Sequence, residues 1–301
     1  MTQLVLAMLL ALVAGVSSSP TSAAGAASST ADLETAADPA PVELHRPRDP
    51  QTGFLPGGDI FAPLIADPRW PHFSMAYQYY INDQSFRDVA AVSVGGTFPL
   101  YRRRAGDGFW EIGVQAGVFA IFDMDTSSFD LINSDYFAAV TTAYRSGQFS
   151  ALGRIVHQSS HLGDEFLLRS TSPSRTDVSY QSVDAKLSYD FDAIRLYGGA
   201  GYLFESEPSL RPWSFQAGLE FRSPWPGPQA WWRPIAAIDL QIREQNDWDA
   251  DVSARAGIEV HGVMANRTIQ FLVEFFHGHS PNGQFFRNTI DYVGIGVHLH
   301  F

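Results

Sequence analysis

The stretch DYVGIGVHLHF, residues 291–301, decides the fold, because from Val293 onward a large apolar side chain occupies every second position. Residues two apart share one face of an extended strand. The opposite face carries only small, aromatic or polar residues, including His298 and His300. Lipid offers no hydrogen-bonding partners to a free sheet edge, so alternating strands can cross it only when their sheet closes. We therefore predict that the chain ends on a strand of a closed β-barrel.

The same period of two recurs in twelve segments after Pro71. Their predicted ranges are 72–82, 87–100, 108–122, 135–145, 149–161, 178–191, 194–205, 212–222, 231–243, 250–262, 268–277 and 291–301. In the third segment, Trp110 and Ile112 lie in the outward phase, and Glu111 lies in the inward phase. We predict an all-β protein, a transmembrane antiparallel β-barrel of about 12 strands with about 10 as the alternative count, over residues 54–301.

Composition separates this prediction from other classes of protein. A soluble β-sandwich also alternates, but its outer face would be polar, whereas the outward phase here is apolar and aromatic. A mean hydropathy of −0.08 is too polar for a helical membrane protein, and a net charge of −12 argues against a nucleic-acid partner. Cysteine is absent and Lys186 is the only lysine. Four tryptophans lie near predicted strand ends, as in the aromatic girdles of membrane proteins: Trp110, Trp213, Trp231 and Trp232.

The first part of the chain has the features of an export signal. Leu4–Val16 is a continuous apolar run that is shorter than the roughly 20 residues of a membrane-spanning helix. Small residues follow it, which is typical of a signal-peptide cleavage site. We predict a signal peptide at residues 1–26, a disordered periplasmic leader at 27–53, and export to the bacterial outer membrane.

Connection lengths predict which end of the barrel faces outward. With an even strand count and both chain ends in the periplasm, connections after odd-numbered strands are extracellular. The long connections 123–134 and 162–177 follow odd strands, whereas the short turns at 146–148 and at Asp192 follow even ones. We expect inward side chains, including His298 and His300, to fill the lumen, which disfavours a wide pore.

Residues 154–165 hold the densest cluster of reactive side chains. His157 and Ser159 are two positions apart on a predicted strand, so both face lipid near the outer leaflet, roughly 6–7 Å apart. This pair resembles the His-x-Ser pair of the outer-membrane phospholipase A family and, less closely, that of the lipid A deacylases. The resemblance implies a lipid-ester hydrolase in which Ser159 is the nucleophile and His157 the general base.

The motif departs from that family at two points. The phospholipase motif continues with Asn-Gly after the serine, whereas this chain has Ser160 and His161. The asparagine that orients the histidine has no counterpart at the expected place. Gln181, in the outward phase of the neighbouring strand, is the candidate that replaces it.

The predicted extracellular rim carries two further groups of candidate residues. Asp164 and Glu165 open a long connection, where they either hold Ca²⁺ through carboxylate oxygens or form a solvated acidic loop. Three rim histidines either converge on a metal or lie among lipid headgroups without one. The candidate rim residues for a ligand are His161, His277, His279 and Asn282, the last in the turn signal Pro281-Asn282-Gly283.

Several separated blocks, in this order, resemble the domain-of-unknown-function 1207 family. The blocks are Phe54–Asp59, Leu64–Arg69, Leu131–Tyr136, Ser159–Leu167, Arg195–Gly199 and His279–Phe285. The resemblance covers residues 54–301 and implies a bacterial envelope protein, without assigning an activity.

Two functions therefore stay open. The favoured hypothesis is a non-enzymatic outer-membrane barrel that binds lipid or a small ligand at its extracellular rim. The alternative is a lipid-ester hydrolase that uses Ser159 and His157, while a small-solute channel is disfavoured. The expected partners are outer-membrane lipids and the barrel-assembly machinery, which would recognise the terminal strand that ends at Phe301.

Overall fold

The computed structural model describes residues 50–81, 86–169, 178–264 and 267–300. All of them belong to one compact unit, Glu43–Phe301. The predicted signal peptide at 1–26, most of the predicted leader at 27–53, and the terminal Phe301 lie outside the described residues. Among the residues that the structure describes, no helix has the length and apolar character needed to cross a membrane.

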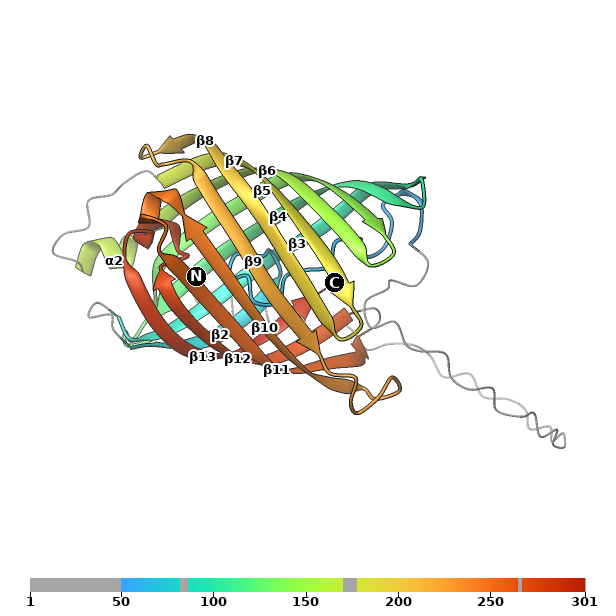
Figure 1. Cartoon of the computed structure of the whole chain (residues 1–301). Helices are drawn as coiled ribbons and strands as arrows, with labels where there is room; N and C mark the ends of the chain where they lie inside the picture. Colours follow the sequence, from blue (N-terminus) through green and yellow to red (C-terminus); the bar gives the residue numbers. More distant parts are fainter. Residues whose placement is uncertain (1–49, 82–85, 170–177, 265–266, 301) are drawn as a thin grey trace, which may run out of the picture. The chain divides into compact units, whose positions relative to one another are not determined.

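Twelve antiparallel strands form a closed barrel (Figure 1). Each strand pairs with the next one along the chain, and β13 pairs with β2 to close the sheet, with Ile295 opposite Tyr77. The twelve-strand prediction is confirmed. The strands are β2 (Phe73–Tyr80), β3 (Asp88–Ala105), β4 (Gly108–Asp123), β5 (Asp130–Ser146), β6 (Phe149–Leu162), β7 (Val178–Phe191), β8 (Ile194–Glu207), β9 (Trp213–Arg222), β10 (Trp232–Arg243), β11 (Ala250–Met264), β12 (Arg267–His279) and β13 (Thr289–His300).

Side chains alternate across the barrel wall, as the terminal strand shows. In β13, Val293 and Ile295 are 43% and 64% exposed, whereas Tyr292 and His298 are 3% and 1% exposed. The outward face is therefore apolar and the inward face carries the polar side chains, which is the arrangement that a bilayer requires. The predicted phase of the terminal strand is confirmed.

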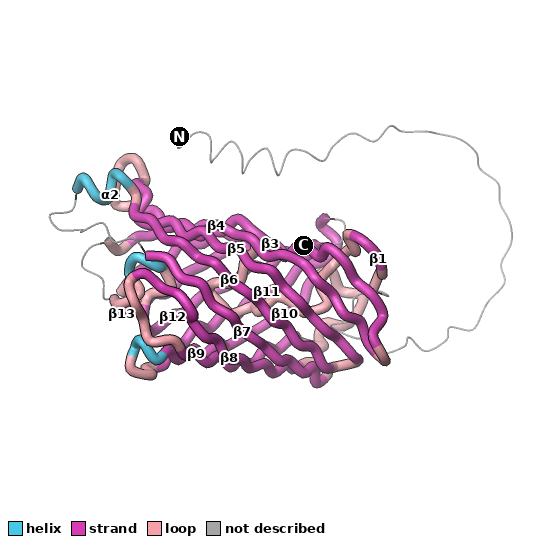
Figure 2. The backbone as a smooth tube through the Cα atoms, turned by 90° about the horizontal axis from the view of Figure 1, so that it is seen from above, coloured by secondary structure: helices cyan, strands magenta, loops and turns pink. Residues whose placement is uncertain are grey.

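Long and short connections lie at opposite ends of the barrel. The end with the long connections, here called the loop rim, carries α2 (Asp164–Arg169), η1 (Glu244–Asn246) and η2 (Gly283–Phe285), which Figure 2 shows at one end of the tube. The other end, the turn rim, has two-residue turns after β3, β5 and β7 and a longer connection at 223–231. Apart from the connection at 223–231, which the sequence also marks as an exception, long and short connections alternate along the described chain as predicted.

One predicted connection is wrong in length. β5 begins at Asp130, so the connection before it covers residues 124–129 instead of 123–134. The first residues of this strand do not alternate between exposed and buried, because Ile132, Asn133 and Asp135 are all fully buried. A short run that is buried on both faces has no period of two, and the sequence pattern therefore missed it.

Residues 55–72, here called the lumen segment, run inside the barrel before β2 begins (Figure 1). The short strand β1 (Gly53–Phe54) precedes them and pairs with β3 near the turn rim. Within the lumen segment, Ile60, Leu64 and Trp70 are each 1% exposed. The sequence predicts a lumen that is largely filled by side chains, and the structure shows that a stretch of backbone fills it as well.

The connection between β12 and β13, here called the cap loop (residues 280–288), folds over the lumen at the loop rim. The backbone N–H of Gly283 donates to Asp135 Oδ2 on β5 (3.0 Å). The side-chain amide of Gln284 donates to the carbonyl oxygen of Ser160 on β6 (2.7 Å). These bonds hold the cap loop against β5 and β6, which are not neighbours of the β12–β13 hairpin in the sheet.

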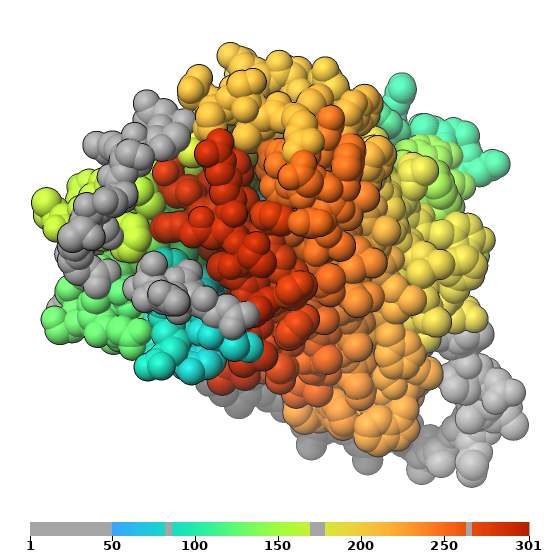
Figure 3. Space-filling model, turned by 60° about the vertical axis from the view of Figure 1, so that its left-hand side comes forward, coloured from blue at the N-terminus to red at the C-terminus, as the bar shows by residue number. Residues whose placement is uncertain are grey.

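An aromatic cluster supports the cap loop. Phe285 packs edge-on against Phe86 and Phe166, with ring centroids 5.7 and 5.9 Å apart. Figure 3 turns the loop rim forward, and the red residues near the end of the chain lie between the cyan and green parts of this rim and the orange ones. The lumen is thus covered by the cap loop at one end and filled by the lumen segment further in.

Candidate functional site

A cavity of about 200 Å³ lies under the loop rim, between the lumen segment and the wall formed by β6–β10. Small residues make room for it, namely Ser182 on β7, Gly199 and Gly201 on β8, and Ser214 on β9. Side chains from three loop-rim connections also line it: Arg211, Gln245 and Phe286. The cavity therefore lies at the loop-rim end of the lumen.

Five basic side chains line the cavity, and four of them are arginines that pair with carboxylates. Arg154 donates to Asp184 through Nε (3.0 Å) and Nη2 (2.8 Å), and its Nη1 donates to Gln115 (3.0 Å). A bidentate pair of this kind fixes the orientation of the guanidinium plane. The other three pairs are Arg69 with Asp135, Arg243 with Asp251, and Arg211 with Asp247.

The fifth basic side chain is Lys186, which is 7% exposed. Its Nζ donates to Gln216 Oε1. The Gln216 amide donates in turn to Asp239 Oδ2 (2.7 Å) and to Asp67 Oδ2 (3.1 Å) of the lumen segment. Gln216 therefore separates the ammonium from the two carboxylates, and among the described ion pairs none joins Lys186 to an acid.

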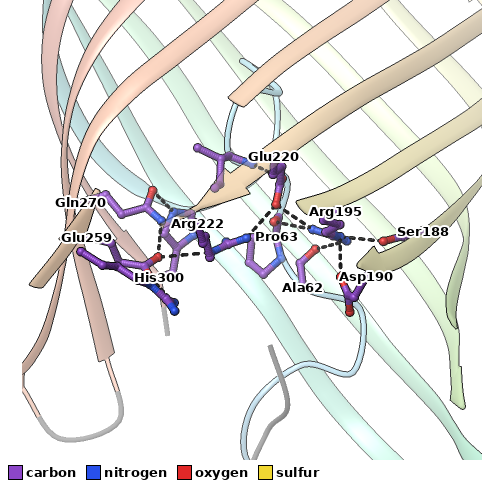
Figure 4. A network of polar contacts seen from close by, with 12 residues as sticks. Ala62, Pro63, Ser188, Asp190, Arg195, Glu220, Arg222, Glu259, Gln270 and His300 are labelled. Carbon is purple, nitrogen blue, oxygen red and sulfur yellow. Dashed lines mark hydrogen bonds and ion pairs between the residues drawn. The ribbon is translucent and has the colours of Figure 1, made fainter. Parts of the chain in front are cut away.

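A network of buried charges beneath the cavity holds the lumen segment (Figure 4). Arg195 of β8 donates to the carbonyl oxygens of Ala62 (3.0 Å) and Pro63 (3.1 Å). Glu220 of β9 accepts the backbone N–H of Ile65 (2.8 Å). Since Arg195 is 1% and Glu220 0% exposed, these bonds form away from solvent, where losing one partner is costly.

Three histidines join the end of the lumen segment to the terminal strand. His72 Nε2 lies 2.8 Å from His298 Nδ1, and the His72 ring stacks on that of His300 with centroids 4.9 Å apart. Burial lowers the pKa of His72 well below its usual value, and His300 and His298 lower that pKa further. Both terminal-strand histidines thus point inward, as the sequence predicts.

The predicted catalytic residues lie on the outer wall. His157 and Ser159 occupy alternate positions of β6, where His157 is exposed and Ser159 half-buried. The register places Gln181 of β7 directly opposite His157. The Gln181 amide nitrogen donates to Glu205 Oε2 (2.7 Å), and no described hydrogen bond joins His157 to Ser159 or Gln181. The structure therefore brings the three backbones together without linking the three side chains.

The predicted rim residues do not converge. His277 pairs with Asp291, and His279 Nδ1 lies 3.1 Å from Asp251 Oδ1. His161 instead contacts the Tyr136 ring edge-on. Each of these histidines therefore has its own neighbour.

The remaining rim candidates lie apart from one another as well. Asn282 is buried in the cap loop, whereas Asp164 and Glu165 are exposed in the first turn of α2. Within the described parts of the chain, no group of three or more His, Asp or Glu side chains has the geometry to hold a metal ion.

The sequence analysis did not find the cavity, because its lining comes from the lumen segment and several distant strands. One signal was present in the sequence. Lys186, the single lysine, lies in the inward phase of β7 between Asp184 and Ser188. A charge in that phase indicates a polar lumen, but its bond to Gln216 on β9 depends on the fold.

The fold is similar to that of solved outer-membrane barrels. The outer membrane phospholipase of Salmonella typhi, solved as a dimer with bound calcium, aligns with a TM-score of 0.57 at 11% identity over 78% of this chain and 93% of that one. Outer membrane phospholipase A from Escherichia coli aligns with a TM-score of 0.55 at 10% identity, over 80% of this chain and 94% of that one. At these identities the similarity shows the barrel fold alone.

A family comparison covers nearly the whole chain. Residues 26–301 match the family model described as "Protein of unknown function (DUF1207)". No curated protein matches the chain. The family match includes the lumen segment and all twelve barrel strands.

Proposed function

The chain belongs to the DUF1207 family, and we propose that it is an outer-membrane barrel that binds a small ligand in the cavity under its loop rim. The observation that carries this proposal is the cavity itself, which is lined by charged, amide and aromatic side chains. Concave sites with a few well-placed polar groups are the usual form of small-molecule sites.

In this proposal the protein lies in the bacterial outer membrane with its loop rim outside the cell. The support is the alternation of long and short connections and the fold that the chain shares with outer-membrane barrels. Outer-membrane lipids surround the apolar wall. The barrel-assembly machinery recognises the terminal strand with Phe301, and the turn rim faces the periplasm.

Binding fits the cavity better than passage through the barrel does. The lumen segment forms the floor of the cavity through Asp67 and Arg69. Below it, Arg195 and Glu220 hold the backbone of the same segment in the lumen. A molecule that enters from the loop rim therefore meets a floor fixed by buried hydrogen bonds, which favours retention.

Native mass spectrometry of the barrel purified from native outer membranes tests this proposal. Ser214→Phe fills the cavity from β9, and Ala217→Phe adds the same ring to the outward face of the same strand. We expect wild type and Ala217→Phe to retain a small molecule that Ser214→Phe loses. Equal retention by all three proteins, or no retained molecule in wild type, would contradict the proposal.

A second candidate function is lipid-ester hydrolysis on the outer wall. The observation that favours it is the strand register, which sets Gln181 opposite His157 with Ser159 two residues away on the same face. The barrel fold is also that of enzymes whose structures are described as outer membrane phospholipases. In this candidate function Ser159 attacks the ester, His157 is the general base and Gln181 orients it. Asp164 and Glu165 then supply carboxylates for Ca²⁺.

Fatty-acid release from phospholipid vesicles, with Ca²⁺ or with a chelator, tests the hydrolase candidate. Ser159→Ala is expected to abolish release while the barrel keeps its resistance to heat in detergent. The matched control is Ser179→Ala, because Ser179 faces Ser159 across the β6–β7 pair. Release that survives Ser159→Ala, or that is absent from folded wild type, would exclude this function.

A further inference from the structure

Lys186 is a buried ammonium without a directly paired carboxylate. It is 7% exposed, and its described hydrogen bond goes to the neutral amide of Gln216. A lysine ammonium has three donors, so one bond leaves two of them free. Burying a charge is costly unless it is paired and fully hydrogen-bonded. The cavity next to Lys186 is the place where the missing acceptors can bind.

Neighbouring carboxylates are already engaged. Asp184 precedes Lys186 by two positions on β7 and accepts three bonds from Arg154. Asp67 and Asp239 both accept from the Gln216 amide, which lies between them and the ammonium. These acids reduce the local positive potential, but none of them supplies an oxygen in contact with Lys186 Nζ.

Among the charged side chains that line the cavity, hydrogen-bond donors outnumber acceptors. Its basic lining residues number five, whereas its lining carboxylates are Asp67 and Asp184. The carboxylates that pair with Arg69, Arg211 and Arg243 lie outside the lining. Most charged atoms that face the cavity are therefore N–H donors, and a ligand rich in acceptors complements them.

We propose that the cavity binds a small molecule through an oxyanion, a carboxylate or a phosphate, which accepts hydrogen bonds from Lys186 and Arg154. This inference rests on the proposed function, because it names the chemical class of the ligand. A volume of about 200 Å³ lies below the roughly 300–1,000 Å³ of sites for drug-sized ligands, so the molecule is about the size of a single sugar. Gly199 lies opposite Lys186 on β8 and leaves room for the lysine stem.

The single lysine gives the test a direct readout. Expression with lysine that carries ¹³C at Cε labels Lys186 alone, because the chain has no other lysine, and it leaves the three N–H donors in place. The probes are inorganic phosphate, sodium glucuronate and uncharged glucose. We expect phosphate or glucuronate to shift the ¹³Cε NMR signal of Lys186 saturably, and glucose to leave it in place. The anion that shifts the signal distinguishes a phosphate group from a carboxylate as the source of the oxyanion.

Calorimetry on unlabelled variants tests the role of the charge. Lys186→Met is expected to weaken anion binding about tenfold or more, whereas Lys186→Arg keeps it within about threefold, because only the first removes the cation. Arg233→Met is the control, since Arg233 pairs with Glu259 and does not line the cavity. Heat-modified mobility in detergent gels confirms that each variant is folded.

Three results would overturn the oxyanion inference. They are unchanged anion binding by Lys186→Met, glucose binding as tight as glucuronate binding, and no response to either anion. None of these three results by itself contradicts the proposed function. If the purified barrel still retains a molecule that Ser214→Phe loses, the cavity is a ligand site of a different chemical class.

Discussion

Arg195 is a buried side chain that ties the barrel wall directly to the lumen segment. It is 1% exposed and donates to the carbonyl oxygens of Ala62 and Pro63, and its Nη1 lies 3.4 Å from Glu220 Oε2. Removing one member of a buried, hydrogen-bonded group leaves the others desolvated and unpaired. Loss of Arg195 should therefore weaken the attachment of the lumen segment to the wall.

Arg195→Met should lower the free energy of unfolding by about 3 kcal/mol, because it leaves buried acceptors without their donor. Denaturant titration in lipid vesicles, followed by tryptophan fluorescence, measures the change. The matched control is Arg211→Met, which removes an exposed ion pair with Asp247 and should change stability by less than about 1 kcal/mol. Equal effects of the two variants would contradict the anchoring role of Arg195.

The pKa of His72 predicts how stability depends on pH. Burial lowers this pKa in the folded protein, so between that pKa and about 6.5 the unfolded chain binds more protons. Stability is then fully present above about pH 6.5 and falls as the pH drops, by up to about 1.4 kcal/mol per pH unit from this site.

His72→Gln should flatten the slope of unfolding free energy against pH between about pH 7 and about pH 5. His298 and His300 remain in this variant, and Arg255 lies near the same cluster, so part of the slope should persist. Denaturant titrations at several pH values give the comparison. A slope identical to that of wild type would show that the pKa of His72 is the same in the folded and the unfolded protein.

At the scale of elements, the strands could be predicted from the sequence and the lumen segment could not. Predicted ranges such as 178–191 and 194–205 agree closely with β7 and β8, because an alternating wall leaves a local pattern in the sequence. The lumen segment has no such period, and its position depends on distant partners. Ile65, for example, bonds Glu220, which is 155 residues away.

For the candidate sites, the faces of the proposed catalytic residues could be predicted from the sequence, and the cavity could not. His157, Ser159 and Gln181 could be placed on one face of neighbouring strands, because phase follows from the strand pattern, but the register that sets Gln181 opposite His157 is known only from the structure. The cavity could not be predicted, because it needs small residues at matching heights on three strands, such as Ser182, Gly201 and Ser214. Sequence alternation reports the face of a residue but not its height in the barrel.

Ile295→Arg should destabilise the barrel by about 2–4 kcal/mol, because Ile295 is 64% exposed in the middle of β13 and would place a charge in lipid. The control is Leu168→Arg on α2 at the loop rim, where Leu168 is 88% exposed, and its effect should stay within about 0.5 kcal/mol. Unfolding titrations in vesicles measure both changes. If Ile295→Arg left the free energy of unfolding unchanged, this result would argue against a lipid-facing wall.

At the scale of the whole molecule, two separate segments close the lumen. The cap loop bonds to Asp135 and Ser160 at the loop rim, and the lumen segment bonds to Arg195 and Glu220 further in. The cavity lies where these two segments leave the wall uncovered. A closed lumen with one polar recess suits a binding protein better than a channel.

This closure predicts low ion conductance for the wild-type barrel in planar bilayers. Deletion of residues 55–70 removes most of the lumen segment and should raise the conductance, because the space inside twelve strands is then filled by side chains alone. Heat-modified mobility in detergent gels checks that the shortened chain still forms a barrel. A folded deletion variant with unchanged conductance would show that the lumen segment does not control passage.

The most direct test of the central claim is an experimental structure of the protein purified from native outer membranes without added ligand. We expect density in the cavity for a small molecule, with an oxygen atom within hydrogen-bonding distance of Lys186 Nζ and of the Arg154 guanidinium. A cavity that holds only ordered water, with Lys186 paired directly to Asp67 or Asp239, would contradict it.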